Sequence, residues 1–196
     1  MLPAYRNRGL ATALKWAQRE RMLALGIDLI TWTYDPLEAP NARLNLHTLG
    51  GIVHEYKRNI YGENFGALGQ GLPSDRFLVE WWLKSERVER CATSREPESI
   101  EPDSPMVNRC RGAGAARRIE SVDLSLDAPA VRVEIPFDLQ AVKQADLPLA
   151  LDWRRKTRNI FETYFEWGYR ALDLVRVGEG AEQQNFYVLK QAHLSE

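Results

Sequence analysis

The first long stretch of helical patterning in the chain runs from residue 9 to residue 25. Its apolar residues recur at helical spacing, whereas its charged residues fall elsewhere, which predicts one helix of about four turns. The residues on the apolar face are Leu10, Ala13, Leu14 and Ala17. Gly26 follows directly and is well placed to cap the C-terminus of this helix.

A second helix is predicted near the C-terminus, from Asp146 to about Trp167. Asp146 is a suitable N-cap, and Pro148 falls in the first turn, where a missing N–H costs little. One face carries the larger side chains Ala150, Trp153, Thr157, Ile160, Phe161 and Tyr164. The basic residues at 154–156 and 158 are expected mostly on the opposite, solvated face.

Short runs rich in β-branched and aromatic residues predict strands. They lie at 27–33, 52–56, 76–83, 131–136, 169–177 and 185–189. Between the first two, Asn41 is a suitable N-cap for a short helix at 42–49, which Gly50 and Gly51 would end. This succession predicts an α/β (α+β) protein with a mixed sheet flanked by helices.

Composition divides the chain into three parts. Residues 1–84 hold the first helix–strand unit, and residues 130–196 hold a strand–helix–strand–strand unit. Between them, residues 85–129 are rich in Glu, Arg, Ser and Pro and predict a poorly ordered linker. The C-terminal unit would either extend the first sheet or form a small lobe of its own.

Overall composition excludes several classes of protein. A net charge of −1 argues against a general nucleic-acid binder, and 44% hydrophobic residues in 196 suffice for a core. No apolar run is long enough for a membrane span, and the N-terminus shows no signal-peptide pattern. Cys91 and Cys110 are not spaced like metal ligands, so no metal site is expected, and reduced thiols suit a cytoplasmic protein.

The start of the first helix is the best candidate for a binding site. The first N–H groups of a helix have no intrahelical partner and carry partial positive charge, so an anion can bind there. Gly9 and Ala11 leave the approach open, and Arg6 and Arg8 add charge beside it. The alternative is an ordinary helix start with two solvated arginines.

The segment Pro3 to Ala11 resembles the acyl-CoA signature of the GNAT acetyltransferases, (Q/R)-x-x-G-x-(G/A), with Arg6, Gly9 and Ala11 at its fixed positions. The helix, the glycine, the strand and the Asn-led helix ending in Leu-Gly also match. The segments 14–21 and 75–82 resemble a little-characterised branch of predicted GNAT-like proteins. The resemblance covers residues 1–84 well and residues 130–190 more weakly.

This resemblance implies that acetyl-CoA or another acyl-CoA is the cosubstrate and that an amine is the acceptor. It implies cofactor contacts at Arg6, Arg8, Gly9, Leu10, Ala11, Thr12 and Asn41. The family's acid is commonly a tyrosine four residues before the Leu-Gly glycine, where this chain has Leu46. His47 is the adjacent ionisable side chain, and Glu55, Glu63 and Glu80 are candidate bases. The departure at Leu46 leaves open a non-catalytic module that binds CoA or a partner protein.

The resemblance also implies that the chain lacks the N-terminal half of the domain, because the signature follows Met1 almost directly. In the family, several strands and two helices precede it. We therefore expect a fragment whose strand at 27–33 has an exposed edge, and an exposed edge promotes aggregation or a homodimer.

Overall fold

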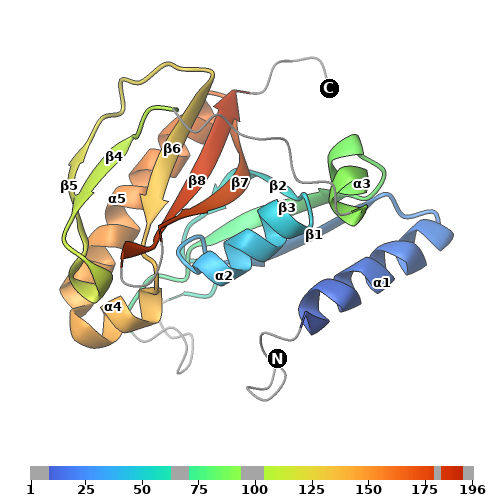
Figure 1. Cartoon of the computed structure of the whole chain (residues 1–196), viewed down its shortest axis with the longest axis horizontal. Helices are drawn as coiled ribbons and strands as arrows, with labels where there is room; N and C mark the ends of the chain where they lie inside the picture. The colour runs from blue at the N-terminus through green and yellow to red at the C-terminus, as the bar shows by residue number, and fades with distance from the viewer. Residues whose placement is uncertain (1–8, 63–70, 94–103, 179–181, 192–196) are drawn as a thin grey trace.

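The computed structural model describes residues 9–62, 71–93, 104–178 and 182–191 (Figure 1). In chain order its helices and strands are α1 (Leu10–Ala24), β1 (Leu29–Tyr34), α2 (Ala39–Ala42), the π-helix η2 (Arg43–Thr48), β2 (Ile52–Lys57), β3 (Arg76–Trp82), α3 (Glu86–Ala92), β4 (Asn108–Arg111), the 3₁₀-helix η3 (Gly114–Ala116), β5 (Arg118–Val122), β6 (Ala130–Ile135), α4 (Leu139–Ala145), α5 (Leu147–Glu166), β7 (Tyr169–Val177) and β8 (Gln184–Gln191).

Six strands form one sheet in the order β1-β3-β2-β7-β8-β6. The expected mixed sheet is not observed, since every pairing between these strands is antiparallel. The C-terminal unit therefore extends the first sheet, which settles the alternative that the sequence left open. Strands β2 and β7 connect the two parts of the sheet, and Val53 and Ala171 are the one register pair between these strands in the described chain.

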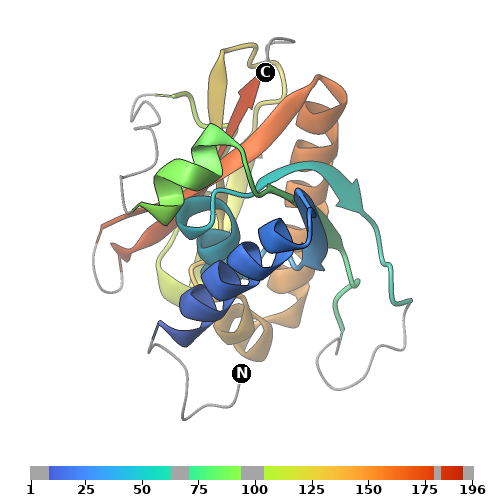
Figure 2. The ribbon, with the colours of Figure 1, turned by 90° about the vertical axis from the view of Figure 1, so that its right-hand side faces the viewer.

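Helices lie on both sides of this sheet. In Figure 1, α2 and η2 lie in front of the strands β1, β3 and β2, whereas α5 lies behind β6 and β8. In Figure 2, α1 lies on the outside of the molecule, in front of α2. The α/β class is thus confirmed. None of the helices in the described part of the chain is both long and apolar enough to cross a membrane.

The core is centred on an aromatic cluster around Phe77, which is fully buried on β3. Its ring lies 4.7 Å from that of Phe161 on α5 and 5.4 Å from that of Tyr187 on β8, measured between ring centroids. Tyr34 and Tyr56 also pack edge-on against it. Residues from both parts of the described chain therefore contribute to this core.

Helix α1 ends as the sequence predicted. Gly26 has φ of 76°, and its N–H bonds to the Leu23 carbonyl while that of Ile27 bonds to Met22. This pattern is a Schellman motif, which needs a left-handed residue that glycine supplies without strain. No residue of α1 is fully buried, but Trp16 packs against Trp81 at 5.7 Å between centroids.

Helix α2, which corresponds to the short helix predicted at 42–49, begins earlier than predicted. Its N-cap is Glu38, and Asn41 lies inside the helix with its N–H bonded to the Glu38 carbonyl at 3.0 Å. Pro40 in the first turn fits this position because its missing N–H would have no partner there. The prediction that Asn41 caps the helix is therefore wrong.

The expectation of a poorly ordered linker over 85–129 is wrong for its described part. Ser85 caps α3 by accepting a hydrogen bond from the Val88 N–H, and Val88 is fully buried. Strands β4 and β5 form a two-stranded sheet whose Ile119 is 3% exposed. Such a hairpin needs few apolar residues of its own because it packs on a larger core. Residues 94–103 lie outside the described residues.

Candidate functional site

The N-terminus of α1, the predicted anion site, has no side-chain cap among the described residues. Its N-cap is Gly9, with φ of 71° and no side chain bonding to the first amides. A Cβ added to Gly9 would meet no atom of the described residues within 4 Å. The first helical hydrogen bond runs from Ala13 to the Gly9 carbonyl, so the N–H groups of residues 10–12 have no partner within the helix.

This end of α1 has the chemistry of an anion site. Amides without an intrahelical partner and the helix dipole both favour negative charge, and Leu10 is 39% exposed. Ala11 and Thr12 are half-buried. The predicted contacts Arg6 and Arg8 lie outside the described residues. Asn41, the remaining predicted contact, is exposed on α2.

His47 is held by a carboxylate on a distant strand. Its Nδ1 lies 3.0 Å from Oδ1 of Asp173 on β7, and the same oxygen accepts the Leu174 N–H at 2.7 Å. The Asp173 side chain is 5% exposed and that of His47 is 29% exposed. A carboxylate in this position fixes the orientation of the imidazole ring. Leu46, at the position of the family's tyrosine, is fully buried in the core.

Glu80 faces away from the core, between the buried residues Val79 and Trp81 on β3. Trp82 donates its indole N–H to Oε2 of Glu80 at 2.9 Å. Oε1 lies 3.7 Å from Nε2 of His54 on β2. Glu80 and His47, the two catalytic candidates, therefore have different partners and belong to different clusters.

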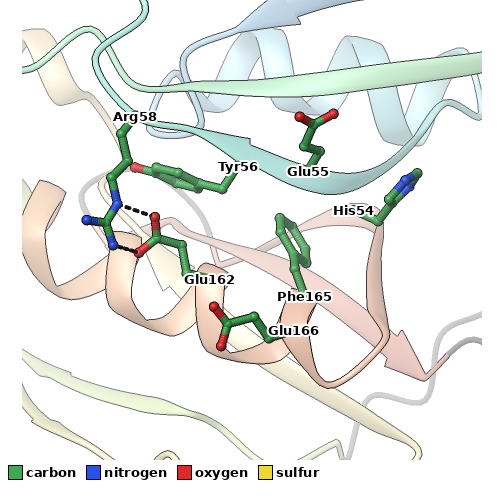
Figure 3. Close-up of a pocket in the computed structure, with 7 residues that line it drawn as sticks. All are labelled: His54, Glu55, Tyr56, Arg58, Glu162, Phe165 and Glu166. Carbon is green, nitrogen blue, oxygen red and sulfur yellow. Dashed lines mark hydrogen bonds and ion pairs between the residues drawn. The ribbon is translucent and has the colours of Figure 1, made fainter.

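A polar pocket of about 530 Å³ adjoins this Glu80 cluster through His54. Figure 3 shows its lining residues, which come from β2 and its end and from α5: His54, Glu55, Tyr56, Arg58, Glu162, Phe165 and Glu166. Arg58 donates two hydrogen bonds of 2.5 Å to the Glu162 carboxylate. Among the described residues, Glu162 pairs with Arg58 and Glu55 pairs with Lys57, so Glu166 supplies the excess negative charge. Beside two aromatic rings, this charge suits a cationic ligand such as a protonated amine. Glu63, another candidate base, lies outside the described residues.

The basic side of α5 is not simply solvated as predicted. Arg154 is 1% exposed and donates from Nη2 to Oδ2 of Asp35 at 2.5 Å. Arg158 donates two hydrogen bonds, of 2.8 and 3.0 Å, to the fully buried Asp75. Tyr56 also donates to Asp75, and burial raises the pKa of Tyr56 well above its usual value.

The one sign of this network in the sequence is an aspartate next to each of two strands. Asp35 directly follows β1, and Asp75 directly precedes β3. Nothing in the pattern pairs them with arginines more than 80 residues away. Among the described residues no group of three or more His, Cys, Asp or Glu side chains is placed to hold a metal ion.

The chain was compared with known protein families, proteins and structures. No family model, no curated protein and no solved structure matches this chain.

Proposed function

We propose that this chain is a GNAT-like N-acyltransferase that seats the diphosphate of an acyl-CoA on the N-terminus of α1. The observation that carries the proposal is that, among the described residues, no side chain caps this helix end and no atom lies within 4 Å of a Cβ built on Gly9. Support also comes from the order α1, Gly26, β1, α2 with η2, and Gly50, which agrees with the pattern of the resemblance. The free thiols of Cys91 and Cys110 fit a cytoplasmic protein.

The acceptor is an amine that attacks the thioester carbonyl carbon directly. The carbon–sulfur bond breaks, CoA leaves as a thiolate, and the amine loses a proton that finally reaches the thiolate. A cationic amine suits the pocket of Figure 3, where Glu166 adds a carboxylate to the Arg58–Glu162 pair. His54, which lines this pocket, and Glu80, 3.7 Å from it, are the groups that can remove the proton.

The thiolate leaves without an acid at position 46, because Leu46 is buried and has no proton to donate. A thiolate is a tolerable leaving group at neutral pH. The same observation favours the second candidate function, a non-catalytic module derived from this family that binds CoA or a partner protein.

Calorimetry with acetyl-CoA and CoA tests the cofactor site. We expect Gly9→Glu to weaken binding at least about tenfold, because it places a carboxylate where the diphosphate would lie. Gly62→Glu is the matched control, since Gly62 has φ of 72° and also meets nothing within 4 Å. Absence of a binding heat in the unchanged protein, or equal losses in both variants, refutes the proposal.

A free-thiol release assay over a panel of amines then separates the two candidates. Release that falls in Glu80→Gln while acetyl-CoA binding is retained supports the transferase. Binding without release on any amine favours the non-catalytic module.

A further inference from the structure

A second pocket, of about 270 Å³, lies between the segment that precedes β3 and the first half of α5. Its lining includes Pro73, Leu151, Asp152, Arg154, Arg155 and Arg158. Three of these side chains are guanidinium groups and one is a carboxylate. No residue of α1 lines this pocket, so it is separate from the acyl-CoA seat proposed above.

Arg154 lines this pocket, and two of its N–H donor atoms are unpaired among the described residues. Its Nη2 bonds to Asp35, but its Nε and Nη1 are buried and have no partner among the described residues. The side chain is 1% exposed, so bulk water does not reach these two donors freely. A buried donor without an acceptor is costly, so an acceptor from outside the described residues would stabilise this site.

The charges around the pocket do not balance. Arg158 is paired with Asp75, Arg76 and Arg154 share Asp35, and Arg155 and Lys156 share Asp152. Five cations therefore face three carboxylates in this cluster. The excess of positive charge, partly buried, favours an anion in the pocket.

We propose that this pocket binds a small oxyanion, either a carboxylate or a phosphate. The anion accepts hydrogen bonds from Arg154 and from Arg158, whose Nε and Nη2 are used by Asp75 and whose Nη1 stands outside that bidentate pair. Arg155, 78% exposed, lies at the mouth and attracts the ligand. Pro73 and Leu151 give the apolar wall that the organic part of such a ligand would contact. Guanidinium forks suit the oxygens of both anions.

The test is the melting temperature of the whole chain against rising sodium phosphate or sodium acetate, with ionic strength held constant by sodium chloride. A specific anion raises the melting temperature with ligand concentration as binding linkage requires, and chloride does not. A response to phosphate alone assigns a phosphate ligand, and a response to acetate alone assigns a carboxylate; either supports the proposal.

Variants locate the site. Arg155→Ala lowers the affinity for the anion about fivefold, as expected for one exposed ion pair. Arg155→Glu abolishes the rise in melting temperature with the anion. Arg154→Lys keeps the positive charge but removes the paired N–H donors of the guanidinium group. It lowers the affinity for the anion about tenfold or more. Arg21→Ala, an exposed arginine in the last turn of α1, is the control and leaves the response unchanged.

Arg155 is exposed, so its variants fold even if Arg154→Lys does not. A melting temperature that rises no more with phosphate or acetate than with chloride overturns the proposal. So does an undiminished response in Arg155→Glu.

Discussion

Arg154 and Asp35 form an ion pair of 2.5 Å between two residues that are 119 positions apart in the chain. Asp35 follows β1 directly, and Arg154 lies in the first half of α5. The Arg158–Asp75 pair makes the same connection one turn further along α5, to the residue before β3. The C-terminal unit is thus fastened to the first three strands by buried charges as well as by the aromatic core.

The first prediction concerns this ion pair. Asp35→Asn leaves the guanidinium of Arg154 without its charged partner, and it lowers the free energy of unfolding by about 3 kcal/mol, the lower end for a broken buried pair. Urea denaturation followed by circular dichroism measures it. Asp28→Asn is the control, because the Asp28–Lys84 pair is exposed, and its loss costs about 1 kcal/mol or less. Equal effects of both substitutions would show that the Arg154 pair does not stabilise the fold.

Gly26 supports a second prediction. Its φ of 76° is unfavourable for alanine, whereas the space around it is empty, so the cost of Gly26→Ala is purely conformational. We expect a loss of about 1 kcal/mol. Gly26→Asn is expected to cost less, because asparagine tolerates the left-handed region better. If urea denaturation gave the same stability for Gly26→Ala and the unchanged chain, the cap would be unimportant.

Local signals in the sequence predicted much of the fold. The apolar period and the following glycine predicted α1 and its cap, and Asp146 does cap α5 through the Leu149 N–H. The six residues expected on the apolar face of α5 are all buried. These features depend on neighbours within a few positions, which a single sequence displays directly.

Features that depend on distant partners could not be predicted in this way. Arg154 is interpreted as a solvated residue from the sequence because its buried position requires Asp35, which only the fold supplies. His47 acquires its partner Asp173 from β7 in the same way. Residues 108–122 form strands because α5 and β6 offer a surface to pack on, not because of their own composition.

Tyrosines with raised pKa values give a prediction on pH. Burial raises the pKa values of Tyr34, Tyr56 and Tyr187 above the usual 10. Above pH 10 the unfolded chain releases these protons while the folded chain keeps them, so stability is complete below pH 10 and falls above it. The expected slope is about −1.4 kcal/mol per pH unit for each tyrosine.

Denaturant midpoints between pH 9 and pH 11.5 measure this slope. Tyr187→Phe removes one of these titrating groups, so its stability should decline less steeply with pH. Tyr164 and Tyr169, whose pKa values burial also raises, still titrate in the variant. The substitution also removes the hydrogen bond from Tyr187 to the Pro36 carbonyl, which lowers stability at every pH. Parallel pH curves for the variant and the unchanged chain would contradict the prediction.

The last prediction concerns the edge of the sheet at β1. Among the described strands β1 pairs with β3 alone, and Leu29–Tyr34 includes neither a charged residue nor a proline. Strands at the edge of soluble sheets usually carry such residues because unpaired backbone groups otherwise bind another strand. We therefore expect the chain to associate with itself as concentration rises, which light scattering coupled to gel filtration measures.

Thr31→Lys should weaken this association, because Thr31 is exposed on β1 and is the register partner of Glu80, whose carboxylate can accept the new charge. Thr93→Lys, at an exposed threonine just after α3, adds the same charge away from the edge and should leave association unchanged. A monomer at every concentration would mean that the open edge of β1 does not recruit a second chain.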